Sequence, residues 1–260
     1  MHSDLALALR LEKIAADFAR STVHTHRALY PDSAAAAVDC GSGVAAFIDE
    51  TSPLTQVKGA GMRAPSTESE LDDVEAFYEE RMSPVTFVLS PVADAALFTY
   101  LSRRGYEIGT FENALFRPMQ PEDAELPPDP DVQPAGEEEW SRTLSEAFFD
   151  IPTPGSLELG RTLYNVPACS SLIIRAGDIP AAGAQVAIYD GVALLQCDGT
   201  VRKYREVGLQ KKLIRHRLYL AAAAGCDVAT ADTQPGSLSQ RNYEKLGFRV
   251  AYTRVTLIKP

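Results

Sequence analysis

The residues best suited to bind a ligand lie in one basic loop, 205–210, with the pattern Arg205-x-x-Gly208-x-Gln210. An apolar run at 192–195 predicts a strand before the loop, and the segment from about 207 to 224 predicts a helix after it. The first N–H groups of a helix have no partner within it, and the helix dipole places partial positive charge there. Because Gly208 lacks a Cβ, a phosphate could approach its backbone closely. The loop therefore predicts an anion-binding site.

Cationic side chains surround this loop, although the chain of 260 residues carries a formal net charge of -10. They are Arg202, Lys203, Arg205, Lys211, Lys212, Arg215 and Arg217. Glu206 is the opposing charge among them. The cations gather at the start of the predicted helix, and the chain as a whole is acidic. This pattern favours a small anionic ligand over a general nucleic-acid surface.

A second group of interest lies close to the C-terminal end. The segment 227–233 alternates like a short strand, a helix is predicted over 240–246 after Ser237 or Ser239, and 248–258 predicts one or two strands. The helix carries Asn242 and Tyr243, and the sequence continues Glu-Lys-Leu-Gly-Phe.

Taken together, the two patterns resemble the GNAT superfamily of N-acetyltransferases. The resemblance implies acetyl-CoA as cosubstrate, with its pyrophosphate on the backbone N–H groups of the basic loop and its pantetheine arm along Gly199, Thr200 and Val201. It implies that Tyr243 lies near the thioester sulfur and protonates the leaving thiolate. The residues expected to bind the cofactor are Gly199, Thr200, Val201, Arg205, Glu206, Val207, Gly208, Leu209, Gln210 and Asn242. The family usually has Gly or Ala where Gln210 stands, often Pro where Arg202 stands, and commonly Asn where Gly236 stands.

The predicted function is transfer of an acetyl group from acetyl-CoA to a primary amine of a small molecule or a peptide. Direct attack on the thioester is expected, since no Cys or Ser with an adjacent base points to a covalent intermediate. Asp198, at the end of the central strand, is the first candidate for the base. Other carboxylates and a water chain remain open as bases; these carboxylates are Asp190, Asp232, Asp150 and Glu146.

Two alternatives stand beside this prediction. Tyr243 could be a core residue whose hydroxyl bonds to backbone, because Tyr is frequent at the edge of cores. The protein as a whole could be a catalytically inactive acyl-CoA-binding sensor or scaffold. Turnover with several amines separates a sensor from an enzyme.

The N-terminal half repeats the order of the C-terminal elements. A strand over 84–90, a helix over 94–103, a Gly-aromatic pair at Gly105 and a strand over 111–116 match the C-terminal end. The counterpart of the basic loop, at 56–61, precedes an acidic helix over 68–80 that would repel a pyrophosphate. The predicted fold class is therefore α/β, with two GNAT-like mixed-sheet halves. Residues 1–118 form the degenerate copy, 119–131 a linker, and 132–260 the domain with the acetyl-CoA site.

The remaining features mostly narrow the class of protein. No apolar run approaches the roughly 20 residues of a membrane span, the first residues lack signal-peptide features, and the four cysteines are scattered singly, so a cytoplasmic protein without a structural metal is expected. His24 and His26 would share one face of a strand, but no third metal ligand is visible. Trp140, Phe148 and Phe149 are predicted to lie on the first helix of the second half, where they could pack in the core or line the acceptor pocket, and core positions are favoured. Neither a monomer nor a homodimer is favoured.

Overall fold

The computed structural model describes residues 3–63, 65–125 and 128–259. The chain forms two compact units, which are described separately: unit 1 comprises Met1–Ala114 and Val250–Pro260, and unit 2 comprises Leu115–Arg249. The units are thus not contiguous halves of the sequence, and the functional boundaries at 118 and 132 remain a prediction. The predicted linker contains a short helix, α4 (Glu122–Glu125), while its residues 126 and 127 lie outside the described part of the chain.

Unit 1 combines helices with a mixed sheet in the order β1-β2-β3-β4-β11-β5. Its elements are α1 (Leu5–Leu29), β1 (Ala36–Cys40), β2 (Gly43–Phe47), β3 (Gln56–Lys58), α2 (Glu68–Glu79), β4 (Val85–Leu89), α3 (Ala95–Arg103), β5 (Glu107–Pro118) and β11 (Arg249–Lys259). Strands β3 and β4 run parallel, with Val57 opposite Phe87, and β11 pairs antiparallel with β4. Gly41 makes the turn of the β1–β2 hairpin with a positive φ of 55°.

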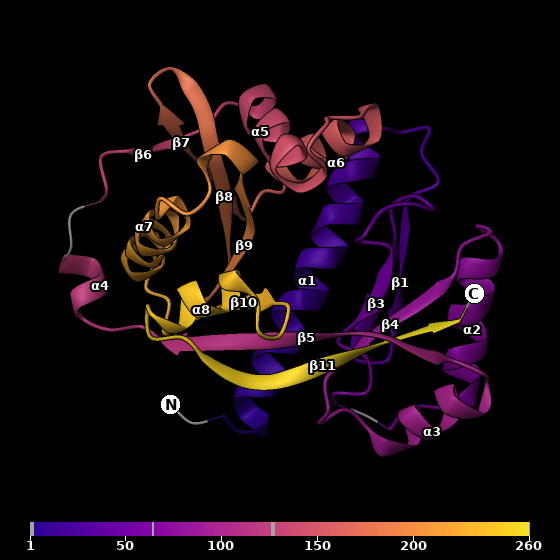
Figure 1. Ribbon diagram of the computed structural model, residues 1–260. Helices are drawn as coiled ribbons and strands as arrows, with labels where there is room; N and C mark the ends of the chain where they lie inside the picture. Colours follow the sequence, from indigo (N-terminus) through magenta and orange to yellow (C-terminus); the bar gives the residue numbers. More distant parts are fainter. Residues whose placement is uncertain (1–2, 64, 126–127, 260) are drawn as a thin grey trace. The chain divides into compact units, whose positions relative to one another are not determined.

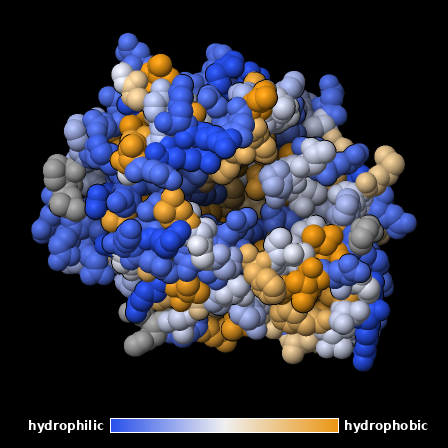
Figure 2. Space-filling model, viewed as in Figure 1, coloured by the Kyte–Doolittle hydropathy of each residue, from blue (hydrophilic) through white to orange (hydrophobic). Residues whose placement is uncertain are grey.

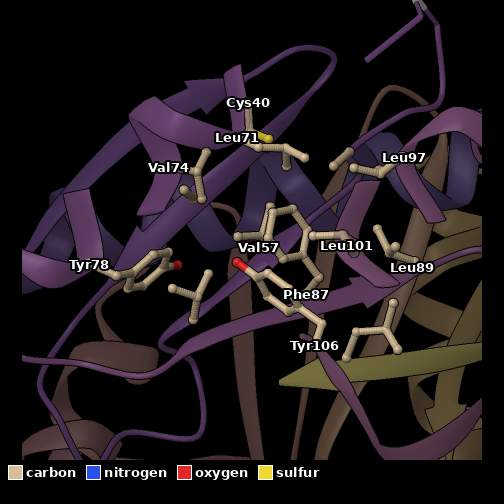
Figure 3. Close-up of a cluster of buried hydrophobic side chains, with 14 of the residues drawn as sticks. Cys40, Val57, Leu71, Val74, Tyr78, Phe87, Leu89, Leu97, Leu101 and Tyr106 are labelled. Carbon is tan, nitrogen blue, oxygen red and sulfur yellow. The ribbon is translucent and has the colours of Figure 1, made fainter. Parts of the chain in front are cut away.

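The hydrophobic core of unit 1 lies between its sheet and the helices α2 and α3 (Figure 3). Phe87 and Val57 project from the sheet, while Leu71 and Tyr78 come from α2 and Leu101 from α3. These side chains are buried, so the removal of their apolar area from water stabilises the unit.

Helix α1 begins at Asp4, whose carboxylate accepts a hydrogen bond from the backbone N–H of Leu7 at 2.9 Å. Its apolar face continues to Val23, which is fully buried. His24 and His26 therefore lie on this helix, and the strand predicted there is wrong. Two residues apart on a helix they point about 200° apart, which removes the shared face on which a metal site depended.

In unit 2, β10 neighbours the end of β5, and the strand order of the same sheet continues β9-β8-β7-β6. The other elements of unit 2 are β6 (Val132–Pro134), α5 (Glu137–Phe149), α6 (Pro154–Tyr164), β7 (Cys169–Ala176), β8 (Ile179–Tyr189), β9 (Val192–Thr200), a 3₁₀ turn (Arg202–Tyr204), α7 (Leu209–Ala223), β10 (Val228–Thr233) and α8 (Leu238–Glu244). The Thr230 hydroxyl donates to the carbonyl of Leu115 at 2.7 Å and so ties β10 to β5.

Helices α5 and α7 lie on opposite sides of β8 and β9 (Figure 1). The helix predicted from about 207 to 224 is present as α7, and its Leu213, Ile214 and Leu218 are buried against the sheet. On the other side, a Cβ on Gly199 would lie 2.8 Å from Leu144 and 2.9 Å from Ala147 of α5. The glycine is thus required for the close approach of α5 to β9.

The two units share one order of elements. In unit 1 a strand, a loop and a helix lead to a parallel strand (β3, α2, β4), and in unit 2 the same sequence is β9, α7 and β10. A further helix follows in each, α3 and α8 respectively. This correspondence supports the predicted duplication, which stays a proposal about the origin of the chain.

Polar side chains dominate the face shown in Figure 2, where hydrophobic side chains occur in small scattered groups. None of the helices in the described ranges is long and apolar enough to cross a membrane.

Candidate functional site

The site begins with an irregularity in β9. This strand pairs with β8 in a register that shifts between Gly183, opposite Gly199, and Gln185, opposite Gln196. Two residues of β9, Cys197 and Asp198, thus face one residue of β8, which is a β-bulge, and Cys197 has a positive φ of 56°. The parallel pairing of β9 with β10 covers 192–194 and 228–230, so the carboxyl ends of the two strands lie beyond their paired segment.

A pocket of about 720 Å³ opens at this end of unit 2. It is lined by the end of β9, the loop before α7, the first half of α8 and the last turn of α5. The lining residues are Ala147, Phe148, Asp198, Gly199, Thr200, Tyr204, Arg205, Glu206, Gly208, Leu209, Gln210, Lys211, Gln234, Ser237, Leu238, Ser239, Asn242 and Lys245. The volume lies in the range of small-molecule and cofactor clefts.

The N-terminus of α7 faces this pocket without a side-chain cap. Gly208 is the N-cap residue, with φ 89° in the left-handed region, and none of the described residues caps it through a side chain. The first turn of α7 holds no acidic residue, and Lys211 belongs to it. Glu206 also has a positive φ, 69°. This end of the pocket suits an anion for three reasons: the first N–H groups are uncapped, the helix dipole is positive there, and Gly208 has no Cβ to block close approach.

The Arg205 side chain holds the loop in place. Its guanidinium donates to the carbonyl of Thr200 at 3.0 Å and to the carbonyl of Ala147, in the last turn of α5, at 2.9 Å. The side chain therefore links three walls of the pocket. Because its guanidinium is engaged in these bonds, the backbone of the loop is the part available to an anion.

Gln210 connects the two helices that flank the pocket. Its amide nitrogen donates to the Ser239 hydroxyl at 2.8 Å, and its amide oxygen accepts from the Asn242 amide at 2.7 Å. The Gln in place of the usual Gly or Ala thus has a structural role, because it joins the first turn of α7 to α8.

A buried polar network lies behind Asp198. Tyr243 donates its hydroxyl hydrogen bond to one carboxylate oxygen of Asp198, and Arg217 pairs with the other. Arg217 also donates to the Tyr243 hydroxyl at 3.4 Å and to the carbonyls of Gln185 at 3.1 Å and Gln196 at 3.3 Å. Burial lowers the pKa of the Arg217 guanidinium, but the charges of Asp198 and Tyr243 and the hydrogen bonds to both together outweigh burial, so the pKa is raised and the group stays protonated.

Tyr243 itself is only 1% exposed. Burial raises the pKa of its hydroxyl well above the ordinary value, Arg217 opposes this and Asp198 adds to it, so the phenol stays protonated at neutral pH. Its partner is a carboxylate rather than the backbone group considered from the sequence. Asp198, which does line the pocket, is the member of the pair that faces a ligand.

The structure brings together most of the residues predicted to form the site. Nine of the twelve line the pocket: Asp198, Gly199, Thr200, Arg205, Glu206, Gly208, Leu209, Gln210 and Asn242. Tyr243 lies behind Asp198, and Val201 is buried with its N–H bonded to Ala181. Val207 is exposed next to the pocket-lining Gly208. Among the described residues, the lining does not include the other carboxylates considered as bases, Asp190, Asp232, Asp150 and Glu146.

Two features of the site differ from what the sequence predicts. Arg217 is one of the cations around the basic loop in sequence, but its i+4 spacing from the apolar Leu213 places it on the buried face of α7. Trp140 is buried as predicted, with its indole N–H donating to Ala184 at 3.1 Å. Phe148 and Phe149 are exposed, so the core positions favoured for them are wrong, and Phe148 lines the pocket instead. The positive φ of Asp150 turns the chain away from the core immediately after them.

No protein-family model and no curated protein sequence matches the chain. Solved structures do. A GCN5-related N-acetyltransferase from Kribbella flavida is 21% identical with a TM-score of 0.65, and the likeness covers 95% of this chain and 96% of that one. A tandem GNAT protein from the clavulanic acid biosynthesis pathway is 13% identical with a TM-score of 0.60, covering 100% of this chain and 96% of that one. The protein therefore has the GNAT acetyltransferase fold, as its sequence predicted.

Proposed function

We propose that unit 2 binds acetyl-CoA and transfers its acetyl group to a primary amine by direct attack. The observation that carries the proposal is the uncapped N-terminus of α7, which opens into a pocket of about 720 Å³ beside the bulge of β9. The backbone N–H groups of Gly208, Leu209 and Gln210 would hold the pyrophosphate, with Lys211 adding charge. The pantetheine arm would lie along Gly199 and Thr200.

The bulged strand also supports an oxyanion site. The N–H of Val201 donates to the carbonyl of Ala181 on the β8 side at 3.0 Å. N–H groups alternate in direction along a strand, so that of Thr200 points away from β8. This donor would stabilise the negative charge that develops on the thioester oxygen as the amine attacks.

Proton transfer in the proposed reaction uses the Asp198–Tyr243 pair. The amine nitrogen forms a bond to the thioester carbon, the carbon–sulfur bond breaks, and the thiolate leaves. Asp198, which faces the pocket, accepts the proton that the amine loses, and the protonated Tyr243 hydroxyl supplies one to the thiolate. Asp198 then returns its proton to Tyr243 across their hydrogen bond, which restores both groups.

One observation favours a second candidate, an acyl-CoA-binding protein without turnover. Tyr243 is almost completely buried and bonded to Asp198, so its hydroxyl must become accessible to the thiolate for the proposed step. A sensor or scaffold would require only the binding half of the site.

The experiment that tests the proposal combines binding and turnover on the full chain. Isothermal titration with acetyl-CoA measures the affinity, and release of the free CoA thiol in the presence of primary amines measures transfer. Micromolar binding with amine-dependent thiol release is expected. Binding without thiol release for any amine supports the sensor, and the absence of binding overturns both.

A further inference from the structure

We propose that the acceptor amine carries an aromatic or alkyl group, which packs on an exposed apolar corner at the end of α5. The corner consists of Phe148, Phe149 and Ile151. The inference rests on the proposed function and names the class of substrate for that same site.

The side chains of this corner are exposed although all three are large and apolar. Phe148 is 56%, Phe149 52% and Ile151 74% exposed, and they lie within four consecutive positions of the chain. Large apolar side chains grouped on a surface next to a cleft are typical of a binding site. Phe148 belongs to the pocket wall, and its ring lies 3.6 Å from the position of a Cβ on Gly199. The corner is thus continuous with the place where the thioester is proposed to lie.

The chain makes a strained turn at Asp150, between the two phenylalanines and Ile151. Asp150 has φ 61° and ψ -40°, and the N–H of Ile151 donates to the carbonyl of Phe149 at 2.7 Å. Together these values describe a γ-turn with positive φ, which is rare and strained for a residue with a side chain. Strained conformations of this kind gather at sites of function because the fold must maintain them against their cost.

The charges around the pocket favour a monoamine over a polyamine. Arg202 is exposed beside the corner, with a guanidinium nitrogen 3.9 Å from the Asp150 carboxylate, and Lys203 and Arg205 follow in the same loop. A substrate with several positive charges would be repelled by this loop, whereas an apolar group would not.

The size of the corner favours a small molecule over a second copy of the chain. Its three side chains expose on the order of 300 Å² at the size of such residues, while a stable protein interface buries about 800 Å² on each partner. A hexyl or phenyl group matches the smaller area.

The test compares amines of similar length at a saturating concentration of acetyl-CoA, with thiol release as the readout. The apolar members are hexylamine and 2-phenylethylamine, and the polar members are 2-(2-aminoethoxy)ethanol and spermidine. We expect kcat/KM to be about tenfold higher for hexylamine than for 2-(2-aminoethoxy)ethanol, from the area that the hexyl group buries. Spermidine should be the poorest substrate.

The double variant Phe149→Ser/Ile151→Ser should reduce the hexylamine preference to about twofold or less, mainly through KM, because the apolar surface is lost. The matched control is Ile179→Ser, which removes an exposed apolar side chain of unit 2 outside the pocket lining and should keep the preference. The Kd of acetyl-CoA is titrated for each variant.

Each other outcome overturns a distinct statement. If acetyl-CoA binds and thiol is released equally with polar amines, the inference fails and the proposed function stands. If the double variant instead impairs turnover of hexanoyl-CoA alone, the corner serves the acyl chain of the donor and the inference fails. If sedimentation shows a dimer that the double variant dissociates, the corner is an interface and the inference fails as well. If no amine gives thiol release, the proposed transfer itself fails.

Discussion

The loops after β3 and β9 occupy equivalent positions in the two units, but their backbones are engaged in different ways. In unit 1, the N-terminus of α2 has a capping box: the Thr67 hydroxyl accepts from the Glu70 N–H at 3.2 Å, and the Glu70 carboxylate accepts from the Thr67 N–H at 2.9 Å. In unit 2, α7 begins at Gly208 and has no such cap among the residues described.

Two further hydrogen bonds engage the backbone of the described part of the unit 1 loop. The Gly61 carbonyl accepts from the Asp94 N–H at 2.8 Å, and the Asp94 carboxylate accepts from the Ser66 N–H at 2.8 Å. A Cβ on Gly61 would lie 3.0 Å from Leu97, so the space beside this glycine is filled. The comparison teaches that the N-terminus of a helix after a strand and loop can be capped by nearby side chains or left uncapped. An uncapped N-terminus keeps N–H groups that a phosphate could bind, whereas a capped one does not.

Each unit also contains one deeply buried arginine paired with a carboxylate, and this pair gives the largest expected effect. Arg217 pairs with Asp198 in unit 2, and Arg254 pairs with Glu12 at 2.7 Å in unit 1. Arg217→Leu and Arg254→Leu should each lower the free energy of unfolding by about 3–5 kcal/mol, because each removes the cationic partner of a carboxylate, Asp198 being largely and Glu12 fully shielded from water. Urea titration measures this loss.

The two arginine variants should differ in function. Per folded molecule, Arg254→Leu should retain acetyl transfer, while Arg217→Leu should lose it since Asp198 and Tyr243 are no longer held. Equal retention in both variants would contradict the difference between the units. Arg217→Lys keeps the charge but not the fork of donors, so it separates loss of charge from loss of orientation.

The open helix end gives the next effect. Gly208→Glu should weaken acetyl-CoA binding by about 1000-fold, because a carboxylate would stand against the pyrophosphate and like charges in contact cost several kcal/mol. Titration calorimetry measures the change in Kd. Gly225→Glu is the matched control: Gly225 follows the other end of α7, has φ 75°, and a Cβ added there would meet no neighbour within 4 Å, so strain and charge are similar. Comparable loss in both variants would indicate unfolding rather than a phosphate site.

Local signals in the sequence were sufficient for the start of α7. Local patterns predict α7 and the position of Gly208 before its first turn, because both depend on neighbouring residues. Anion binding at this helix end stays a prediction. The contacts of Arg217 were not predictable in this way. Its partner Asp198 reaches it only because a bulge in β9 turns that carboxylate toward α7, and a bulge depends on the register with another strand.

Long-range pairing explains the other differences. Strand β11 lies in the sheet between β4 and β5, more than 150 residues after β4 in sequence, and the strand pattern of 248–258 carries no sign of its partners. The exposure of Phe148 and Phe149 is likewise invisible in the pattern, since apolar residues on a helix predict a core face. Both residues lie in the last turn of α5, where Phe148 lines the pocket.

The two units can also be compared through one buried tyrosine hydroxyl in each, that of Tyr243 in unit 2 and that of Tyr78 in unit 1. Tyr243→Phe should lower kcat for acetyl transfer by about 100-fold, as expected for loss of a general acid, and should leave the Kd of acetyl-CoA within about twofold. Tyr78→Phe in unit 1 removes a hydroxyl that donates to the Ala46 carbonyl at 2.9 Å and should cost about 1 kcal/mol of stability without any effect on kcat. Thiol release under single-turnover conditions distinguishes them, and unchanged chemistry in Tyr243→Phe would remove this residue from the proton route.

The smallest effect concerns the capped N-terminus of α2 in unit 1. Thr67→Ala should lower the free energy of unfolding by about 1 kcal/mol, because the Glu70 N–H loses its acceptor at the start of α2. It should not create a binding site, since Glu68 and Glu70 remain in the first turn and would repel a phosphate. Calorimetric titration of this variant carrying Gly208→Glu measures unit 1 alone. Acetyl-CoA binding that appears in the double variant would mean that the capping box, rather than the acidic turn, keeps unit 1 closed.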